Sequence, residues 1–316
     1  MSSDVIRAKS IIYSGRGGFD VVSVGERSVR APEANEIRIK VAAASASPTD
    51  ILLRDPGYAD AVLPMTPGMD ASGVVESMGA GVTQFAIGDE VMAVVLPPRA
   101  EGGAQAAFIV IPAASAVRKP GNVTLVEAST VPMNGLTALY VLNLAALAPG
   151  QTLAVTGGAG WLAYMTIVIA KLRGLRVVAD AQSTDFELVR GYGADIVVER
   201  GDGFKAAVRR EVPEGVDALL DTALLAEKAF PAIGDGGLYI PVRGWNGAAA
   251  EREIRIQPVM VPEVLERTDW LEALREMVEA GHIVPRVSAK YTPEQIADAQ
   301  HSLLAGGVRG RPVILF

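Results

Sequence analysis

From residue 152 to residue 242, short apolar segments alternate with longer segments of helical period. The predicted strands are 152–156, 176–179, 196–198, 216–221 and 238–242, and the predicted helices between them are 161–172, 186–192 and 204–211. Strands that are apolar on both faces and joined by helices are typical of a parallel sheet covered on both sides. We therefore predict an α/β chain with a doubly wound parallel sheet.

The first third of the chain has a different period. In residues 36–43, apolar side chains alternate with Arg38 and Lys40, and further short segments of this kind are separated by glycine and proline. Alternation with period two indicates half-buried strands, so we predict a small, mostly antiparallel β-domain. A final strand at 312–316 is expected to rejoin it. The predicted domains are 1–124 with 285–316, and 125–284.

The composition excludes several kinds of chemistry. Of 316 residues none is cysteine and only His282 and His301 are histidine, so thiol nucleophiles and cysteine-based metal sites are excluded. The formal net charge of -7 disfavours nucleic-acid and anionic-membrane partners. No apolar run reaches the roughly 18 residues that a bilayer span requires. We therefore expect a soluble, cytoplasmic protein.

A glycine-rich turn follows the first strand of the predicted sheet. Its residues are Gly157, Gly158, Ala159 and Gly160, and the next helix begins with Trp161 and Leu162. Small residues at this point let backbone amides at a helix start face a pyrophosphate. About twenty residues further on, Asp180 ends the next strand, where an acid could bind an adenosine ribose. The pattern indicates a dinucleotide site; the alternative is a Rossmann-like turn that binds another ligand or none.

Several segments together resemble one family, through their order and spacing. They are Gly15–Asp20, Ala44–Asp50, Pro67–Val75, Gly88–Val91, Val131–Ala138, the glycine turn, Gly215–Asp221 and Gly307–Arg311. Over nearly its whole length the chain resembles the zinc-independent quinone oxidoreductase branch of the medium-chain dehydrogenase/reductase superfamily, which includes zeta-crystallin-like proteins. The resemblance implies a GroES-like β-domain plus a Rossmann doubly wound parallel-sheet domain, a cleft that holds NADPH, and a homodimer.

The resemblance also argues against a catalytic metal. Zinc-dependent relatives carry a cysteine where this chain has Ser47, a histidine where it has Met69, and a third ligand near Met133. Without a Lewis acid, the reaction that the resemblance implies adds hydride from a reduced nicotinamide to a quinone or an α,β-unsaturated carbonyl. The oxygen that gains charge then needs hydrogen-bond donors and a proton.

Three hydroxyl side chains are the candidate catalytic residues: Ser47, Thr49 and Tyr58. By position, Ser47 resembles an asparagine that orients the substrate in many family members, and Thr49 resembles a hydroxyl residue that relays protons in the zinc-dependent branch. The alternative for 47–50 is a turn in which Asp50 caps the next helix, and for Asp50 we favour that role. Tyr58 follows in a loop that the family places over the substrate, as donor, lid or packing residue.

The resemblance extends the cofactor site beyond the turn. It adds Thr137, Ser183, Arg200, Val242 and Arg311, and it places Met133 at the substrate pocket, to which the position of Trp245 in the predicted sheet adds a second residue. For Thr137 the alternative is an ordinary helix threonine that bonds back to a carbonyl. Trp245 follows the strand 238–242, at the carboxyl edge of the sheet where ligands bind in open α/β folds.

Two departures from the family pattern concern the cofactor. Trp161 stands where relatives usually have glycine, so its indole either crowds the pyrophosphate or points into the helix interface, and we favour the second orientation. Asp180 would repel a 2′-phosphate and suits NADH, whereas Arg200, Arg309 and Arg311 could supply positive charge for NADPH. We expect NADP(H), with NAD(H) as the alternative, and no zinc.

The predicted function is hydride transfer from a reduced nicotinamide to a small-molecule quinone or α,β-unsaturated carbonyl, by a zinc-independent oxidoreductase. The alternative is a protein of the same fold that has lost this redox function. Such a protein would act as a non-redox enzyme or a binding protein on a polyketide-like small molecule. Trp161 and Asp180 motivate this alternative, which predicts no tight dinucleotide complex.

Overall fold

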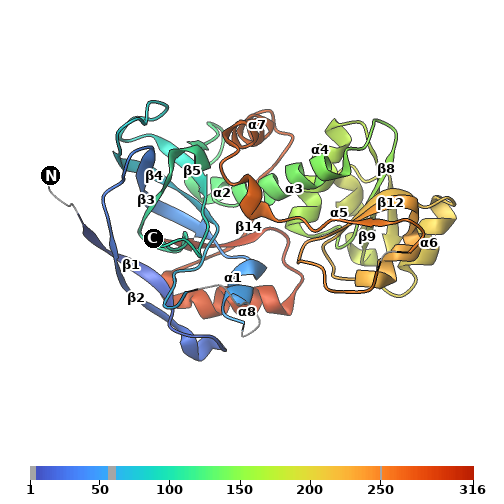
Figure 1. The fold of residues 1–316 in the computed structure, drawn as a ribbon, viewed down its shortest axis with the longest axis horizontal. Coiled ribbons are helices and arrows are strands. Elements are labelled where there is room, and N and C mark those ends of the chain that lie inside the picture. The colour runs from blue at the N-terminus through green and yellow to red at the C-terminus, as the bar shows by residue number, and fades with distance from the viewer. Residues whose placement is uncertain (1–4, 56–61, 250) are drawn as a thin grey trace. The chain divides into compact units, whose positions relative to one another are not determined.

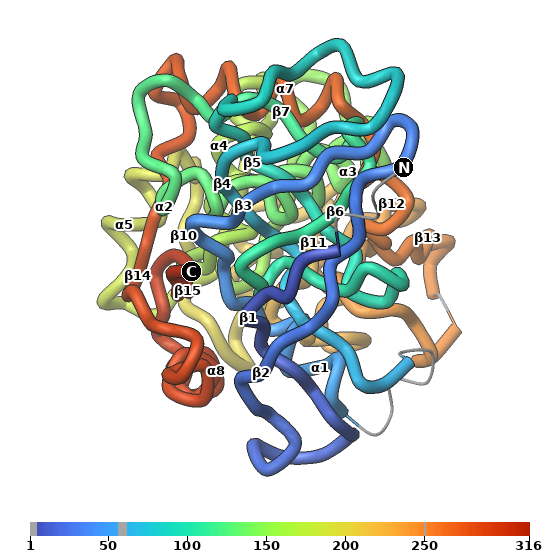
Figure 2. Tube along the Cα trace, turned by 90° about the vertical axis from the view of Figure 1, so that its left-hand side faces the viewer, coloured from blue at the N-terminus to red at the C-terminus, as the bar shows by residue number. Residues whose placement is uncertain are grey.

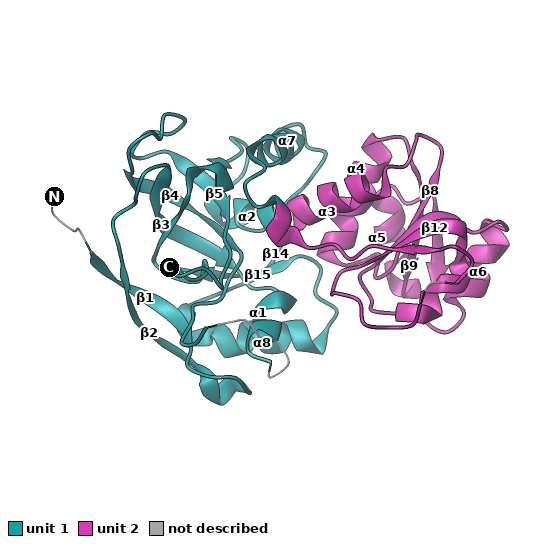
Figure 3. Cartoon of the chain, viewed as in Figure 1, with its two compact units in different colours: residues 1–133, 264–316 teal, residues 134–263 magenta. Residues whose placement is uncertain are grey.

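The computed structural model describes residues 5–55, 62–249 and 251–316. The chain forms two compact units, which Figure 3 shows in different colours: unit 1 is 1–133 with 264–316, and unit 2 is 134–263. Each unit has sheets of its own, and the predicted combination of a β-domain with a doubly wound parallel sheet is confirmed. The predicted functional domains, divided at 125 and 285, stay a prediction, because a compact unit of the fold need not coincide with a functional domain.

Unit 1 is built mainly from antiparallel strands (Figure 1). They are β1 (Ile6–Tyr13), β2 (Val22–Val29), β3 (Glu36–Ser45), β4 (Asp70–Met78), β5 (Glu90–Val94), β6 (Phe108–Pro112), β7 (Ala116–Arg118), β14 (Val287–Tyr291) and β15 (Arg311–Leu315). β1 and β2 pair with each other, as Figure 2 shows. The other strands form a seven-stranded sheet of order β14-β15-β3-β4-β5-β7, in which β6 also pairs with β3.

The chain end completes this sheet. β15 lies antiparallel to β3, with Val313 opposite Ser45 and Ile314 opposite Ala44, and β14 lies parallel to β15. The prediction that the final strand rejoins the N-terminal β-domain is therefore confirmed. Within its described residues, unit 1 has the α-helices α1 (Pro48–Leu53), α2 (Leu125–Ala128), α7 (Thr268–Glu279) and α8 (Ile296–Ala305).

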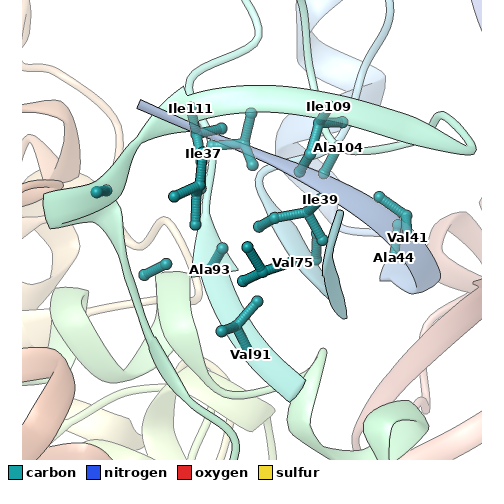
Figure 4. Packing of buried hydrophobic residues seen from close by; sticks show 14 of the residues in the cluster. Ile37, Ile39, Val41, Ala44, Val75, Val91, Ala93, Ala104, Ile109 and Ile111 are labelled. Carbon is teal, nitrogen blue, oxygen red and sulfur yellow. The ribbon is translucent and has the colours of Figure 1, made fainter. Parts of the chain in front are cut away.

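The core of unit 1 follows from the alternation along β3. Ile37, Ile39 and Val41 are buried and pack with apolar side chains from β4, β5 and β6 (Figure 4). Arg38 lies between them but is itself almost fully buried, because its guanidinium forms an ion pair with Glu76, Nε to Oε2 at 2.6 Å. A buried arginine of this kind needs its partner, since an unpaired buried charge is costly.

Unit 2 contains a six-stranded parallel sheet of order β10-β9-β8-β11-β12-β13. The strands are β8 (Thr152–Val155), β9 (Arg176–Ala181), β10 (Ile196–Glu199), β11 (Val216–Asp221), β12 (Ile233–Pro241) and β13 (Arg255–Ile256). The direction in which strands are added reverses between β8 and β11. The chain first adds β9 and β10 on one side of β8, and then adds β11, β12 and β13 on the other side. Ligands bind at the carboxyl ends of the strands at such a switch point.

The helices of unit 2 are most of α3 (Pro132–Ala145), α4 (Trp161–Leu172), α5 (Phe186–Gly191) and α6 (Phe204–Glu211), with the 3-10 segments η3 (Ser183–Asp185) and η4 (Ala226–Ala232). α6 and η4 cover one region of the sheet through Phe204, Val208 and Phe230. Within the described residues, no helix is long and apolar enough to cross a membrane.

Candidate active site

The glycine turn between β8 and α4 has the backbone geometry that its sequence predicts. Gly157 has φ of +66°, and a Cβ there would lie 2.6 Å from Thr222 Oγ1. A Cβ on Gly158 would lie 2.7 Å from the carbonyl oxygen of Asp180. Gly160 is the N-cap of α4, and its N–H donates to the Gly157 carbonyl at 2.8 Å. The turn therefore depends on residues without side chains at two consecutive positions.

Asp180 holds this turn from the neighbouring strand β9. Its carboxylate accepts the N–H of Gly157, and its carbonyl oxygen accepts the N–H of Gly158 at 2.9 Å. Only 3% of Asp180 is exposed. Burial raises the pKa of the carboxyl, and the hydrogen bonds from the turn oppose that rise. Asp180 is thus directed at the backbone of the turn.

Trp161, the first residue of α4, lies inside the helix interface. Its exposed fraction is 3%, and its indole stacks on Tyr164 with 5.1 Å between ring centroids. Tyr164 in turn meets Tyr192 edge-on at 4.8 Å. This is the second of the two orientations expected from the sequence. Leu162, the next residue of α4, is half-buried.

A buried hydrogen-bond network joins the carboxyl ends of β8, β11 and β12 beside the turn. Asp221 accepts the hydroxyl protons of Thr156 and Tyr239, both at 2.7 Å, and the N–H of Ala226 at 3.0 Å. Thr156 Oγ1 accepts the N–H of Ala223 at 3.0 Å. The network fixes the strand ends at the switch point, and sequence reasoning did not identify it.

The other predicted site residues of unit 2 lie at or near the carboxyl edge of the sheet, except Thr137, which lies in helix α3. Val242 directly follows β12, and Trp245 packs on Tyr239 and Phe230 while its Nε1 donates to the Ala248 carbonyl at 3.2 Å. Ser183 begins η3 and is exposed. Arg200 directly follows β10 and is exposed. Thr137 is buried within α3.

In unit 1, Ser47 and Asp50 begin helix α1 as the sequence predicts. Asp50 Oδ2 accepts the N–H of Ser47 at 2.7 Å, so Asp50 caps the helix, while the N–H of Asp50 donates to the Ser47 carbonyl at 3.0 Å. The Ser47 hydroxyl takes no part in the cap. It is buried and has no hydrogen-bond partner among the described residues. Thr49 lies in the first turn of α1 and is half-buried.

The carboxyl groups of Asp50 and Asp70 and the guanidinium of Arg311 form a buried cluster near Ser47. Asp50 also accepts the N–H of Gly68 at 3.0 Å and the Gln105 amide at 3.0 Å. Burial raises the pKa of Asp50 to about 7 and that of Asp70 to about 6, against the opposing charge of Arg311. Burial also lowers the pKa of Arg311, and the two carboxylates oppose that shift. Arg311 therefore neutralises charge inside unit 1.

Met133 meets this cluster through its backbone. Its N–H donates to Asp70 Oδ1 at 2.6 Å, and Ser45 donates its hydroxyl to Asp70 Oδ2 at 2.9 Å. The side chains of Met69 and Met133 are both buried. No group of three or more histidine, aspartate or glutamate residues that could hold a metal occurs in the part of the chain that the structure describes.

The structure thus brings Ser47, Met133 and Arg311 together around Asp50 and Asp70, and it brings the turn, Asp180 and Arg200 together in unit 2. Tyr58 lies outside the described residues. Sequence reasoning missed Asp70, Gln105 and Tyr239 as site residues. Asp70 falls inside a segment that carries the family resemblance, which was the one available signal; Gln105 and Tyr239 carry none, since their roles depend on long-range contacts.

Comparison with known proteins agrees with this geometry. Two family models match the chain: the alcohol dehydrogenase GroES-like domain over residues 33–121 and the zinc-binding dehydrogenase over residues 174–314. A crystal structure of an alcohol dehydrogenase superfamily protein from Novosphingobium aromaticivorans has the same fold. Its TM-score is 0.88 at 24% identity, over 98% of this chain and 99% of that one.

Two curated relatives match nearly the full chain. The chloroplastic NADPH-dependent alkenal/one oxidoreductase of Arabidopsis thaliana is 29% identical over 97% of this chain and 79% of the relative. The 2-methylene-furan-3-one reductase of Solanum lycopersicum is 27% identical over 97% of this chain and 78% of the relative. The fold and these matches define an oxidoreductase. The chain belongs to the medium-chain dehydrogenase/reductase superfamily, in its quinone oxidoreductase-like branch.

Proposed function

We propose that this oxidoreductase uses NADPH to reduce the carbon–carbon double bond of an α,β-unsaturated carbonyl compound, or a quinone. The named activities of the relatives from Arabidopsis and tomato support this substrate class. The observation that carries the chemistry is the Ser47 hydroxyl, which is buried beside a charged cluster and left without a partner among the described residues. A buried hydroxyl without a partner is costly unless a ligand completes it.

The residues of unit 2 fit a dinucleotide. The added Cβ atoms at Gly157 and Gly158 would meet neighbouring atoms at 2.6 and 2.7 Å, so only a glycine turn gives a backbone of this shape. Backbone N–H groups at the start of α4 would hold the pyrophosphate, because they have no acceptor within their own helix. When bound, the reduced nicotinamide supplies a hydride to the electron-poor carbon of the substrate.

The residues of unit 1 serve the substrate oxygen. As hydride adds to the double bond, negative charge develops on the carbonyl oxygen, and the Ser47 hydroxyl donates a hydrogen bond to it. Asp50 fixes the Ser47 backbone at 2.7 Å, so the hydroxyl is held in place before the substrate arrives. Thr49 is the second hydroxyl of this helix start, and Tyr58 remains a candidate donor.

The geometry weakens the argument for a non-redox or binding role, which depended on Trp161 and Asp180. Trp161 lies against Tyr164 inside the helix interface, and Asp180 is directed at the turn backbone.

We further propose that the protein works without zinc, as a cytoplasmic homodimer. The absence of cysteine, and the methionines Met69 and Met133 at positions where zinc-dependent relatives place or approach ligands, support zinc independence.

The test is oxidation of NADPH by the purified protein, followed at 340 nm, with a small enone, a quinone and the corresponding saturated ketone. The expected result is turnover with the enone or the quinone and none with the saturated ketone. Tight NADPH binding without turnover of any of these acceptors would overturn the proposed substrate class. Absence of dinucleotide binding by the folded protein would overturn the redox function.

A further inference from the structure

Gln105 lies in unit 1 on the segment between β5 and β6, and its backbone is fixed on both sides. Its N–H donates to the Pro67 carbonyl at 2.9 Å, and its carbonyl oxygen accepts the N–H of Ile11 at 3.0 Å. The side chain is fully buried. A Cβ on Gly68 would lie 2.8 Å from Gln105 Cγ, so the side chain passes directly over a glycine. β1 and the segment before β4 therefore set the position of Gln105.

The amide of Gln105 reaches both sides of the helix start that carries Ser47. Its Nε2 group donates to the Ser45 carbonyl at 3.2 Å and to Asp50 Oδ2 at 3.0 Å. Ser45 ends β3, two residues before Ser47, and Asp50 lies in α1, three residues after it. One side chain thus joins the end of a strand to the cap of the next helix, across the residue between them.

The oxygen of Asp50 that accepts this amide also holds the backbone of Ser47. Asp50 Oδ2 accepts the Ser47 N–H at 2.7 Å, while Oδ1 accepts the Gly68 N–H at 3.0 Å. A carboxyl oxygen has two lone pairs, and both are used here. Gln105 therefore fixes the direction of the carboxyl group that caps α1. The direction of the Ser47 side chain follows from this cap.

The other end of the Gln105 amide is unsatisfied. Gln105 Oε1 is buried and has no hydrogen-bond partner among the described residues. Such an acceptor costs free energy, and an apolar side chain of the same size would avoid that cost. Turning the amide over would place Oε1 against the Ser45 carbonyl and the Asp50 carboxyl, so the two donations fix its orientation. A polar residue that breaks a packing rule in this way is typical of a functional site.

We propose that Gln105 is a positioning residue for the reaction: by bonding to Ser45 and Asp50, it sets the direction of the Ser47 hydroxyl toward the substrate oxygen. Gln105 acts through Ser47 and does not touch the substrate. This inference rests on the proposed function, in which that hydroxyl donates to the oxygen that gains negative charge. Misplacement of a reacting group by about 1 Å can cost about a hundredfold in rate, so the fixing of this backbone matters.

The first experiment is steady-state reduction of the enone with NADPH by the unaltered protein and by Gln105→Met. Methionine keeps the size of the side chain and removes both donations. We expect kcat to fall by about tenfold to a hundredfold, with the KM of the enone and the affinity for NADPH nearly unchanged, because the lost interaction acts in the transition state. An unaltered kcat, or a rise in KM alone, would overturn the assignment.

Gln300→Met is the matched control. Gln300 is also fully buried in unit 1, and its Nε2 group donates to the Tyr13 hydroxyl at 2.6 Å. It reaches α1 at the other end of the helix, where Arg54 Nε donates to its Oε1 at 3.3 Å. This variant should keep the kcat of the unaltered protein. An equal fall of kcat in both methionine variants would show that general loss of packing in unit 1 explains the effect.

The double variant Ser47→Ala with Gln105→Met decides whether Gln105 acts through Ser47. If it does, adding Gln105→Met to Ser47→Ala should change kcat by no more than about twofold, because the hydroxyl that Gln105 positions is already gone. If the two losses multiply, Gln105 acts independently of Ser47 and the assignment fails.

Gln105→Glu separates hydrogen-bond donation from shape. A protonated carboxyl can donate one hydrogen bond to Asp50, whereas an ionised one is repelled by it. Asp70 on β4, Arg311 on β15 and Tyr13 on β1 also interact with Asp50 and are the same in each protein. The kcat of Gln105→Glu relative to the unaltered protein should therefore be near one at pH 5 and fall by pH 8. A ratio that does not change with pH would show that donation to Asp50 is unimportant.

The failures of the two proposals differ. If the unaltered protein reduces the enone but Gln105→Met keeps its kcat, only the assignment of Gln105 fails. If the folded, unaltered protein reduces none of the acceptors, the proposed function fails and the assignment fails with it. Circular dichroism and a melting curve establish that each variant is folded; if Gln105→Met is not, the pH profile of Gln105→Glu decides.

Discussion

The indole of Trp161 and the ring of Tyr164 stack with 5.1 Å between centroids and 20° between planes. The two residues are three positions apart in α4, so their side chains lie on the same face of the helix. Tyr192, which follows α5, extends the contact edge-on. Three aromatic rings thereby tie the start of the helix behind the glycine turn to the end of the next helix.

Trp161→Ala should therefore destabilise unit 2. Removing a buried tryptophan leaves a cavity and is expected to lower the free energy of unfolding by about 3–5 kcal/mol, whereas Trp161→Phe should cost less. Urea unfolding, with amide exchange in α4 and α5, measures the effect. Trp270→Ala is the matched control, since Trp270 is only half-buried in unit 1. A loss below about 1 kcal/mol in Trp161→Ala would contradict the packing described.

Gly158→Ala should abolish dinucleotide binding with little effect on unit 1. The new Cβ would lie 2.7 Å from the Asp180 carbonyl and 3.3 Å from Val189 Cγ1, so backbone must move and the turn must change shape. Gly157→Val should act in the same direction, because that residue has positive φ. Gly191→Ala is a clean control, since a Cβ there meets nothing within 4 Å. Titration with NADPH distinguishes them; equal affinity for the Gly158 and Gly191 variants would refute the turn assignment.

Ser47→Ala should lower kcat and leave the fold intact. Removing one donor to a developing oxyanion costs about a hundredfold to a thousandfold in kcat, while the NADPH affinity should not change. Since Ser47 Oγ is buried and has no partner within the described chain, its removal should raise the free energy of unfolding of the ligand-free protein, by up to about 1–3 kcal/mol. Steady-state kinetics and urea unfolding give the two readouts.

Ser45→Ala provides the contrast for stability. The Ser45 hydroxyl donates to Asp70 Oδ2 at 2.9 Å, so its removal should cost about 1–3 kcal/mol by leaving a buried carboxyl less satisfied. Thr49→Ala should follow Ser47→Ala if both hydroxyls serve the substrate oxygen. Full turnover in both the Ser47 and Thr49 variants would move the proton source to water or to Tyr58.

Stability of unit 1 should fall as the pH rises from about 4 to about 7. Burial raises the folded-state pKa of Asp50 to about 7 and of Asp70 to about 6, above the ordinary value of 3.8. Between these values the folded protein binds more protons than the unfolded chain, so each such proton lowers the free energy of unfolding by up to about 1.4 kcal/mol per pH unit. Above pH 7 the contribution is constant.

Urea unfolding at pH 5, 6, 7 and 8 measures this slope, and Asp50→Asn should make it shallower because one of the two titrating groups is removed. A slope of the opposite sign in the unaltered protein would show that the hydrogen bonds to the two carboxylates outweigh their burial.

Periodicity located the elements of unit 2 well. The helices Trp161–Leu172 and Phe204–Glu211 and the strand Val216–Asp221 have the predicted limits. Each begins directly after a glycine, and a glycine or proline follows each of the two helices within two residues of its end. The prediction for β12 was wrong at its start: the strand begins at Ile233, five residues before the predicted Leu238. Gly234, Gly236 and Gly237 lie outside the predicted strand, whereas in the structure they belong to β12, whose pairing with β11 is irregular there.

The candidate site was predictable where a short segment contains both the residue and its partner. Asp50 caps the helix that starts at Ser47, three residues away, and this contact is local. The partner of Asp180 is 23 residues distant, and that of Tyr239 is 18, so the direction of their polar groups depends on how strands pair. From its sequence position Asp180 was therefore predicted to bind the ribose, whereas in the structure its carboxylate accepts the N–H of Gly157 in the turn.

The strand β15, which completes the sheet of unit 1 against β3, also sets the order in which the chain can fold during synthesis. Unit 2 is one continuous segment, so all of its residues have left the ribosome while the last strand of unit 1 is still inside. Domains fold as units during translation, and unit 1 must wait for its final residues. Until then residues 43–45 of β3 lack the strand that pairs with them, and an unpaired stretch of sheet edge of this kind can pair with another chain and aggregate.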